Sequence, residues 1–567
     1  KATESLVAFV KCENFVDYLL GHYQVYKKII SRHLCYWQAI YDGLLENSEE
    51  PEDPAFNTIG WVSSYSQKCI PSYQMKEWLD NTLTRLKVLQ PKRVLEVGVG
   101  TGMLLAALAP KVERYDATDT SNVAITNLKK YFSKEAYQHV NYFNGELSTL
   151  LLKKTYDTVI LNSVVQYFPD ILYLTKTLDQ LVDRVEPGGQ VFLGDIYHYD
   201  YIEDFHVSVQ LQHQSPEMKL SEFQALISRL VSKEGELFIH PQLFMDYAKR
   251  HKRINQVNIQ LKPGLSHNEL NGFRYDVVLG VEKLCVEVNQ STVKQFSELS
   301  TIESIGDYLS SEQPENLIVK SIPNLRVIGL SVYSSFRDKI NSQIKSLREA
   351  VYQHGFAALD PHYCYELGKK LGYQVSCVWS EKKHAFDVAF YITNNPLQSY
   401  CNETEEKESY YFNYSNMPLL RQFQNKVEEE LKQHASQHLA SYMQPHEIIF
   451  LDEIPFTANG KVNHKELEKL TLSASQSYEG KCLEPINDTQ EKLLSIFKQV
   501  LRLRIVDIHK GFIQLGGDSL MMLETTYAIE KQFGINLTLG ELIAHPSVHE
   551  LSLFLSAKVA LAQEVSA

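Results

Sequence analysis

The nine residues from Val94 to Gly102 constrain the fold of this chain more than any other stretch. They read Val-Leu-Glu-Val-Gly-Val-Gly-Thr-Gly, so an apolar run passes directly into alternating glycines. The apolar run predicts a buried strand, and the glycines predict a tight turn where a ligand can approach bare backbone. Met103–Leu108 follows with helix-like spacing. This strand–turn–helix order predicts an α/β sheet with a nucleoside-type ligand at the end of a strand.

The surrounding sequence extends this pattern. From residue 91 to about residue 283, apolar runs alternate with amphipathic stretches, which predicts a parallel sheet with crossover helices. The expected strands are Arg93–Val97, Arg114–Thr118, Thr158–Leu161, Gln190–Leu193, Val257–Leu261 and Tyr275–Val281. The expected helices include Met103–Leu108, Ala124–Phe132 and Leu172–Val185.

Length and composition bound the function class. A chain of 567 residues is too long for one core and predicts three or four domains. The net charge of −13 without a basic block argues against nucleic-acid binding. The sequence shows neither an apolar run of membrane-spanning length nor a secretory leader, so a cytoplasmic location away from membranes is expected. The eight cysteines are scattered and form no CxxC pair, so reduced thiols and no metal site are expected.

The rest of the chain divides into zones. Residues 1–11 contain a strand-like run, and residues 12–90 are mostly helical in pattern. Residues 284–396 repeat the strand–helix alternation less clearly, and residues 397–475 contain a charged helix, Leu419–Leu439. A linker near 472–484 leads to a final domain at 485–567. Because Lys1 is not a methionine and a strand follows at once, we expect a piece of a longer polypeptide.

The glycine turn has a distinctive pattern and a carboxylate partner. It reads E-x-G-x-G-T-G, which differs from the G-x-G-x-x-G turn of dinucleotide-binding folds. Asp119 ends the next strand, where its carboxylate can accept hydrogen bonds from both hydroxyls of a ribose. A doubly wound domain without any cofactor is the alternative interpretation.

These motifs resemble class I S-adenosylmethionine-dependent methyltransferases, which have a Rossmann-like core. The resemblance implies that Glu96 and the glycines Gly98, Gly100 and Gly102 face the methyl donor. It also implies that Asp119 holds the ribose and that Gly145 and Glu146 lie near the adenine. Glu146 is the poorer match, since an aspartate is frequent there.

Further motifs narrow the resemblance to the N-methyltransferase domains of nonribosomal peptide synthetases. They run in the family's order over roughly residues 30–395: Trp37-Gln38, Tyr41-Asp42, Phe56–Trp61, Ser64-Tyr65, Asn162–Pro169, Gly194-Asp195, His267–Leu270 and Phe273–Asp276. The resemblance implies a helical lid at about 12–90, a core at about 91–283 and an extension at about 284–396. Asn162, Trp61 and Tyr65 are its further candidates for donor binding. Packing of the lid alone is the alternative for Trp61 and Tyr65.

The chemistry of amine methylation suggests the polar candidates. The methyl group is already activated, so alignment of a neutral amine and exclusion of water are the main requirements. The candidates for orienting the amine and passing on its proton are Tyr167, Asp195, His267, Glu269, Arg274 and Tyr275. Glu269 is the preferred amine partner. A structural Glu269–Arg274 ion pair and a purely structural His267 are the alternatives left open.

A second resemblance lies near residue 460. Tyr442–Pro445 and Leu451–Asn463 resemble the end of the small α+β C-terminal subdomain of adenylation domains. The resemblance makes Lys461, in the Asn459-Gly460-Lys461 turn, the adenylation lysine. Residues 1–11 would be the first part of this subdomain, with 12–396 inserted and 397–475 as the remainder. Because the large adenylation subdomain is absent, we expect Lys461 to be idle and this chain alone not to activate an amino acid.

A third motif, Leu515–Met522, places Ser519 after two glycines at the start of an apolar helical run. An ordinary helix cap is one interpretation. The run also resembles the phosphopantetheine attachment site of peptidyl carrier proteins, which are four-helix bundles. In that case Ser519 carries 4'-phosphopantetheine, added by a phosphopantetheinyl transferase.

Together the motifs predict an α/β multidomain chain that methylates the α-amine of an aminoacyl group tethered to Ser519. Its other partners would be the upstream adenylation core and further synthetase domains. Epimerisation or a silent domain, methylation at side-chain carbon, oxygen or sulfur, and a non-catalytic carrier module are the alternatives. The sequence does not name the amino acid, the final peptide, the oligomeric state, the base or the position of the carrier domain.

Overall fold

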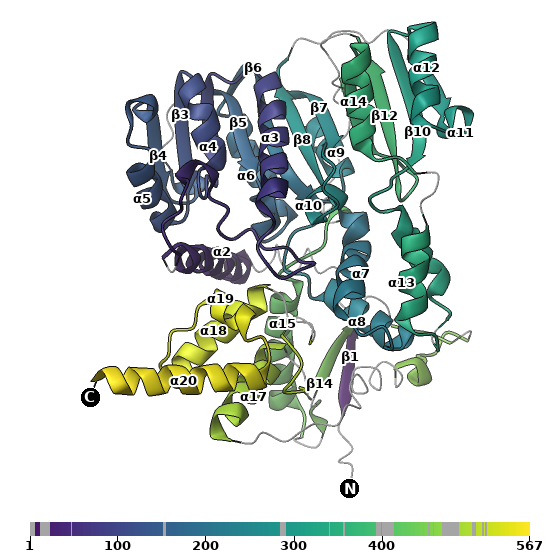
Figure 1. Cartoon of the computed structure of the whole chain (residues 1–567). Coiled ribbons are helices and arrows are strands. Elements are labelled where there is room, and N and C mark those ends of the chain that lie inside the picture. The colour runs from purple at the N-terminus through teal and green to yellow at the C-terminus, as the bar shows by residue number, and fades with distance from the viewer. Residues whose placement is uncertain are drawn as a thin grey trace. The chain divides into compact units, whose positions relative to one another are not determined.

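The structure is a computed structural model of the chain (Figure 1). It describes residues 6–11, 23–46, 48–150, 155–283, 291–339, 341–354, 358–392, 398–399, 413–440, 443–445, 447–451, 454–457, 459–467, 487–501, 506–512, 515 and 519–566. The expected linker at 472–484 and the glycines and aspartate before Ser519 lie outside these residues. The chain forms two compact units, one of residues 38–232 and 236–416 and the other of residues 1–37, 233–235 and 417–567.

An eight-stranded sheet organises the larger unit, in the order β13-β7-β8-β6-β5-β2-β3-β4. Its strands are β2 (Arg93–Val97), β3 (Arg114–Asp119), β4 (Val140–Asn144), β5 (Tyr156–Asn162), β6 (Val185–Tyr197), β7 (Ile254–Leu261), β8 (Arg274–Val281) and β13 (Gln398–Ser399). All six expected strands coincide with strands of this sheet.

The expectation of an all-parallel sheet is wrong at one side. The pairs from β6 through β4 are parallel, but β8 pairs antiparallel with both β6 and β7. The reason is the connection, because the short segment between β7 and β8 holds only the four-residue helix α10 (Glu269–Gly272). A parallel pair needs a crossover that carries the chain back along the sheet, usually through a long α-helix, and α10 is only about one turn long.

Helices cover both faces of this sheet (Figure 1). They include α3 (Ser72–Val88), α4 (Met103–Leu108), α5 (Asn122–Tyr131), α6 (Ile171–Val182) and α9 (Gln242–Arg250). Val94 and Ile160 pack with α3, α4 and α5, whereas Leu95 and Val159 pack with α6 and α9. Neighbouring residues of one strand thus serve two cores, which explains why the strands are apolar on both faces.

The expected helix Leu172–Val185 ends earlier than predicted, at Val182. Val185 already belongs to β6 and pairs with Tyr156 of β5. The same apolar residues suit a buried strand or a buried helix, so periodicity alone did not place this boundary.

The rest of the larger unit is a helical layer and a second sheet. The helical layer contains α7 (Ile202–His213), α8 (Leu220–Ser232), α13 (Ile344–Gln353) and the 3-10 helix η7 (Ile328–Phe336), which share one core. The second sheet has the order β11-β12-β10-β9, formed by β9 (Thr292–Gln295), β10 (Asn316–Pro323), β11 (Gln374–Trp379) and β12 (Ala385–Tyr391). It packs with α11 (Phe296–Leu299), α12 (Ile302–Glu312) and α14 (Pro361–Leu371). The weak alternation at 284–396 therefore corresponds to a separate small sheet.

Short 3-10 helices connect the elements of the larger unit. They are η1 (Pro54–Phe56), η2 (Ala109–Lys111), η3 (Glu135–Tyr137), η4 (Leu147–Thr149), η5 (Val165–Tyr167) and η6 (Tyr199–Tyr201). The long helix α2 (Tyr23–Glu46) precedes them and contributes its last residues to this unit.

In the smaller unit, two strands that lie far apart in the sequence pair with each other. β1 (Val7–Lys11) runs parallel to β14 (Glu447–Leu451), with Phe9 opposite Ile449. The charged helix expected at Leu419–Leu439 is α15 (Leu420–His438). The strand-like run expected within residues 1–11 is therefore a strand, and its partner lies more than four hundred positions away in the sequence.

Four helices are described between residues 487 and 566. They are α17 (Asp488–Leu501), α18 (Ser519–Phe533), α19 (Leu539–Ala544) and α20 (Val548–Ser566). Their apolar residues form one shared core, which includes Phe497, Ile529, Leu542 and Leu551. Ser519 is the first residue of α18.

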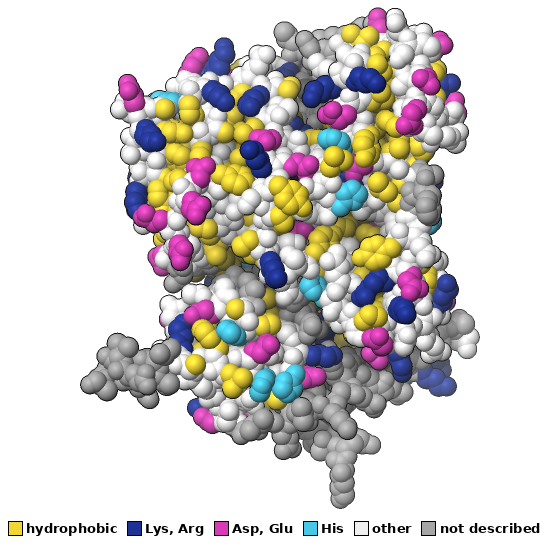
Figure 2. Space-filling view, in the orientation of Figure 1, with side chains coloured by type: hydrophobic (Ala, Val, Ile, Leu, Met, Phe, Trp, Pro, Cys, Tyr) yellow, Lys and Arg dark blue, Asp and Glu magenta, His cyan; other side chains and the backbone are white. Residues whose placement is uncertain are grey.

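The described helices include none that combines the length and apolar character needed to cross a bilayer. Acidic and basic side chains are interspersed over the face shown in Figure 2. This surface gives no sign of a basic footprint for nucleic acid.

Candidate functional site

The candidate site lies at the carboxyl edge of the eight-stranded sheet. Glu96 is near the end of β2, Asp119 ends β3, Asn162 ends β5, and Asp195 lies near the end of β6. These four strands run parallel, so their carboxyl ends meet at one edge. Ligands of open α/β sheets bind at this edge.

The glycine turn between β2 and α4 requires its glycines. Gly98, Gly100 and Gly102 all have left-handed backbone, with φ of 75°, 56° and 84°. A Cβ on Gly98 would lie 2.4 Å from Val164 Cγ2, and one on Gly102 would lie 2.4 Å from Leu128 Cδ2. The turn is therefore fixed by backbone conformation and by packing, and its bare backbone faces the site.

Replacing Gly98 by alanine tests the turn. We expect Gly98→Ala to weaken binding of S-adenosylmethionine and to lower the free energy of unfolding by about 2–4 kcal/mol, since left-handed strain and overpacking add. Gly188→Ala is the matched control, because Gly188 has φ of 84° but nothing within 4 Å of its Cβ position. Calorimetric titration and thermal unfolding measure both effects. Unchanged donor affinity in Gly98→Ala would place the donor elsewhere.

Two carboxylates flank the turn. Asp119 accepts the backbone N–H of Gly100 at Oδ2 (2.9 Å) and that of Ser121 at Oδ1 (2.8 Å). A carboxylate has about four acceptor positions, so Asp119 retains acceptor capacity for an incoming donor. Glu96 is buried and accepts the Tyr115 hydroxyl at 2.6 Å, and burial raises the pKa of Glu96 to about 8. Backbone and side-chain donors thus hold both carboxylates in place beside the glycines.

Tyr41 and Asp42, at the end of α2, also reach this turn. The Tyr41 hydroxyl lies 2.9 Å from the position of a Cβ on Gly100, and Asp42 accepts a hydrogen bond from the Ser121 hydroxyl. Burial, together with the charge of Asp119, raises the pKa of Tyr41 well above its usual range. Sequence reasoning quoted these residues as a lid motif but did not place them at the site.

The other donor-site candidates lie around this edge. Gly145 follows β4 and donates its N–H to the Asp119 carbonyl at 2.9 Å, and Glu146 is the next residue. The Trp61 ring packs against Trp78 with centroids 4.6 Å apart. The Tyr65 hydroxyl lies 3.2 Å from the hydroxyl of Ser208.

Asn162 presents an unpaired acceptor. Its side-chain NH₂ contacts Ser163 Oγ at 3.1 Å, whereas its buried Oδ1 has no hydrogen-bond partner among the described residues. Gly194 on β6 lies against this amide, since a Cβ there would be 1.9 Å from Oδ1. A buried carbonyl without a donor is costly and indicates a ligand group at this point.

Glu269 also presents an unpaired acceptor. It is 2% exposed, and its Oε1 accepts the backbone N–H of Ser64 at 2.7 Å. Its buried Oε2 has no hydrogen-bond partner in the described part of the chain. Asn268 caps the short helix α10 and fixes the segment that carries this carboxylate.

Arg274 does not pair with Glu269 among the described residues. Its guanidinium donates to the Tyr197 hydroxyl at 2.6 Å and lies 4.1 Å from the centre of the Tyr197 ring. Burial opposes this charge, but Tyr197 and Asp195 stabilise it and hold the pKa of Arg274 above its ordinary value. The Glu269–Arg274 ion pair that the sequence left open is thus absent from the described contacts.

Asp195 belongs to a buried ion-pair network. It accepts the Trp78 indole N–H at 2.8 Å and lies 2.5 Å from Lys262 Nζ. Lys262 is also 3.0 Å from Asp276, which pairs with Arg85. Burial alone would raise the pKa of Asp195, but the charges of Lys262 and Arg274 outweigh it and keep that pKa below its usual value. Sequence reasoning missed Lys262, which no local pattern marks.

Three further candidates, Tyr275, Tyr167 and His267, differ in burial and in their contacts. Tyr275 is fully buried and donates its hydroxyl to the Ile239 carbonyl at 2.8 Å. Tyr167 ends η5, close after Asn162. His267 is 55% exposed and lies 3.6 Å from Asp360, on the loop before α10.

The two motifs outside the larger unit are described in part. Lys461 is exposed on a tight hairpin, where its carbonyl accepts the N–H of Thr457 at 2.7 Å. Ser519 begins α18, and the three residues before it lie outside the described part.

Comparison with known proteins assigns three stretches to families. Residues 95–191 match the model of a methyltransferase domain, residues 417–461 that of the AMP-binding enzyme C-terminal domain, and residues 491–555 that of a phosphopantetheine attachment site. These stretches contain the glycine turn, Lys461 and Ser519 in turn.

Two curated relatives illustrate the similarity over the whole chain. Chondramide synthase of Chondromyces crocatus is 30% identical over 564 residues, covering 94% of this chain and 14% of the relative. Cyclosporin synthetase of Tolypocladium inflatum is 26% identical over 557 residues, covering 91% of this chain and 4% of the relative. The chain therefore spans only a small part of the curated relatives that it matches.

Among solved structures, the N-methyltransferase NodS of Bradyrhizobium japonicum WM9 in complex with S-adenosyl-l-homocysteine matches with a TM-score of 0.27. It is 15% identical, and the match covers 37% of this chain and 88% of that chain.

Proposed function

We propose that this chain, which belongs to the nonribosomal peptide synthetase family, methylates the α-amine of an aminoacyl group thioester-linked to phosphopantetheine on its Ser519. The observation that carries the proposal is the buried Glu269 carboxylate, whose Oε2 lacks a partner among the described residues. A methyltransferase domain implies S-adenosyl-L-methionine, and an attachment site implies 4'-phosphopantetheine.

The residues at the carboxyl edge fit the methyl donor. Gly98, Gly100 and Gly102 offer bare backbone, Asp119 offers lone pairs for the ribose hydroxyls, and Asn162 Oδ1 offers an unpaired acceptor. When bound, S-adenosyl-L-methionine supplies an activated methyl group. Tyr41, Trp61 and Tyr65 would close the donor site against water, with Gly145 and Glu146 beside the adenine.

Glu269 would bind the amine. An α-amine has a pKa near 8, so a useful fraction is neutral at neutral pH and no strong base is needed. With Oε1 held by the Ser64 N–H, Oε2 is free to accept an amine N–H and then a proton. The fixed orientation matters most, because alignment supplies much of the rate in such a transfer.

The remaining polar candidates would act by positioning. Asp195 and Tyr275 are buried and already bonded within the protein, so they fix the strands that carry Gly194 and Arg274. Arg274 and Tyr167 would line the substrate site and orient the carbonyl of the aminoacyl group. His267 is exposed and would steady the loop before Glu269.

The carrier would deliver the substrate as a tethered group. Tethering gives a high effective concentration, so the site needs little intrinsic affinity for the aminoacyl group. A phosphopantetheinyl transferase would load Ser519, and the adenylation core of the synthetase would supply the amino acid. The four helices at 487–566 with their shared core support a helix-bundle carrier at 485–567.

The pairing of β1 with β14 supports a split adenylation subdomain. Residues 1–11 and 397–475 would form it, with the methyltransferase of 12–396 inserted between them. Lys461 would be idle in this chain by itself, as the resemblance to the small adenylation subdomain implies. We expect no exchange of pyrophosphate into ATP by this chain alone.

Mass spectrometry of the loaded carrier separates the alternatives. Aminoacyl-phosphopantetheine on Ser519 is incubated with S-adenosylmethionine, and the released amino acid is fragmented. One methyl group on the amine supports the proposal, and a methyl group on carbon, oxygen or sulfur contradicts it. Inverted stereochemistry without added mass supports epimerisation, and absence of donor binding supports a carrier and docking module.

Glu269→Gln tests the amine partner. We expect the methylation rate to fall by about a hundredfold or more while donor affinity stays unchanged, since the amide keeps the Ser64 contact but loses the basic oxygen. The exposed Glu303→Gln variant is the control. Single-turnover rates on the loaded carrier measure the effect, and an unchanged rate in Glu269→Gln would remove this residue from the mechanism.

A further inference from the structure

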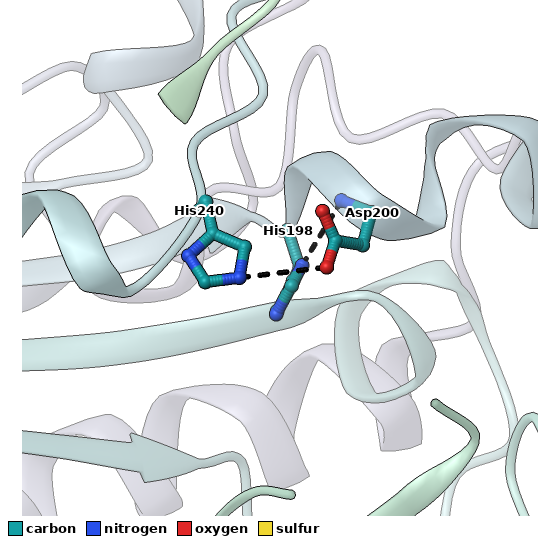
Figure 3. Close-up of side chains that lie close together, drawn as sticks. All are labelled: His198, Asp200 and His240. Atoms are coloured by element: carbon teal, nitrogen blue, oxygen red, sulfur yellow. Dashed lines mark hydrogen bonds and ion pairs between the residues drawn. The ribbon is translucent and has the colours of Figure 1, made fainter. Parts of the chain in front are cut away.

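Two histidines and an aspartate lie close together just after the end of β6. Figure 3 shows His198, Asp200 and His240 with their polar atoms turned toward one another. One ligand atom of each lies within 4.8 Å of the other two. His198 directly follows β6, Asp200 lies in η6, and His240 comes shortly before α9.

The backbone around these residues is tightly fixed. The Ile239 N–H donates to the Tyr197 carbonyl at 2.7 Å, and the Tyr199 N–H donates back to the Ile239 carbonyl at 3.3 Å. The His240 N–H donates to the Tyr414 carbonyl at 2.7 Å. The three side chains are therefore presented from a hydrogen-bonded frame, which limits the loss of entropy on binding a ligand.

His198 and Asp200 are in the protonation form that a metal ligand needs. His198 is 3% exposed, and burial lowers its pKa to about 3, so the imidazole is neutral. Its Nδ1 accepts the Asp200 N–H at 3.2 Å and therefore carries a lone pair. The hydrogen bond from His240 keeps the pKa of Asp200 below its ordinary value, so this carboxylate is charged.

The surroundings combine an apolar wall with an open side. The ring of His198 packs edge-on against Trp379, with centroids 5.1 Å apart, and His240 stacks with Tyr414. Asp200 is 51% exposed and His240 is 34% exposed, so solvent reaches the cluster from one side. The nearby cation, Lys383, is paired with Asp204 at 2.7 Å.

We propose that His198, Asp200 and His240 bind a divalent transition metal ion, with zinc as the tested ion. Two imidazoles and one carboxylate form a donor set that zinc uses, with water as a fourth ligand. The 3.4 Å between His240 Nε2 and Asp200 Oδ2 matches the roughly 3.3 Å edge of a tetrahedron around zinc.

Binding has a local cost and a local consequence. The ion would replace the N–H of Asp200 at His198 Nδ1, and His240 would give up its Nδ1 contact with the Gln242 N–H at 3.1 Å to bind through Nε2. The bound ion would link η6 to the segment before α9. Tyr197 directly precedes His198, and its hydroxyl accepts a hydrogen bond from Arg274, so the metal would restrain a residue that contacts the proposed substrate site.

Zinc binding to the full chain, measured by elemental analysis after gel filtration and by chelator competition, tests the proposal. We expect one tightly bound zinc, with affinity reduced at least about tenfold in His240→Ala, His198→Gln and Asp200→Asn. Asp200→Asn changes an exposed side chain, so its folding is expected to be unaffected. The absorption spectrum of the Co²⁺-substituted protein shows which ligands are used. Cysteine thiolates give sulfur-to-cobalt charge-transfer bands, whereas imidazole and carboxylate ligands do not, so we expect these bands to be absent.

The chain offers a matched control. His251 also accepts an N–H two residues ahead at Nδ1 (3.3 Å), and its Nε2 faces Asp179 at 3.8 Å. It belongs to no three-ligand group among the described residues. His251→Ala should leave zinc affinity unchanged. Equal zinc affinity in the unaltered chain and the three ligand variants would overturn the proposal, as would thiolate bands that account for all of the bound cobalt.

Discussion

Ser519→Ala is expected to abolish methylation of a tethered amino acid completely while leaving the binding of S-adenosylmethionine unchanged. The hydroxyl of Ser519 is the proposed attachment point of phosphopantetheine, and alanine offers no atom for that bond. The proposed donor site lies in the larger compact unit and Ser519 in the smaller one, so the substitution removes the substrate and leaves the site intact. Mass spectrometry of the protein after treatment with a phosphopantetheinyl transferase and coenzyme A gives the loading directly.

A second serine in the same domain provides the control. Ser556, on α20, donates only to the Ser552 carbonyl at 2.7 Å, and Ser556→Ala should load and methylate normally. Loading of Ser519→Ala would show that another residue is the attachment point. Loss of donor binding in Ser519→Ala would show that the carrier and the methyltransferase do not act as separate units.

Lys262→Met is expected to destabilise the fold by about 3–5 kcal/mol, because it leaves buried carboxylates without their shared cation. Lys262 is 2% exposed and contacts both Asp195 and Asp276. Asp195 also holds Trp78, which packs against Trp61, so donor affinity should fall as well. Denaturant unfolding and calorimetric titration measure the two effects.

The pH dependence of the stability lost in Lys262→Met shows whether Lys262 stabilises the fold through its charge or through its packing. The pKa of Asp195 is lower in the folded chain than in the unfolded chain, so the ion pair stabilises the fold above the ordinary pKa of an aspartate, near 4. This stabilisation disappears as pH falls through the lower folded value. The difference between Lys262→Met and the unaltered chain should therefore be full at pH 7 and shrink below about pH 4.

A surface pair supplies the comparison for Lys262. Lys249 lies 3.0 Å from Asp246 and is 36% exposed, so Lys249→Met should cost at most about 1 kcal/mol. If Lys262→Met proved equally mild, or if its effect were the same at every pH, the buried network would not be held together by charge.

The proposed metal site shows a limit of sequence reasoning. No metal was expected, because the cysteines are scattered and form no CxxC pair. His198 and Asp200 are two residues apart, but His240 lies forty positions further on. The backbone hydrogen bonds of its neighbour Ile239 with Tyr197 and Tyr199 bring it to them. A ligand set of this kind exists only after the chain has folded.

The same limit applies to the edge of the sheet. Arg93–Val97 and Met103–Leu108 were predicted with their observed bounds, because buried strands and the helix after a glycine turn have strong local patterns. β4 was missed, since only one residue of Val140–Asn144 is buried and its apolar pattern is therefore weak. The antiparallel pairing of β8 depends on the segment between β7 and β8. The sequence gives the length of this segment but not the path that it takes.

The sequence by itself determined the order of the domains and the parts with local signatures, namely the strand–glycine–helix turn, the Asn459-Gly460-Lys461 hairpin and the serine at a helix start. These features need only neighbouring residues, so a linear motif records them. The tertiary structure decided which polar groups have a partner within the protein. Asp195 pairs with Lys262 and accepts a hydrogen bond from Trp78, whereas Glu269 Oε2 has no described partner. Burial and pairing depend on residues far apart in the chain, and these two quantities select Glu269 from among the candidates as the proposed amine partner.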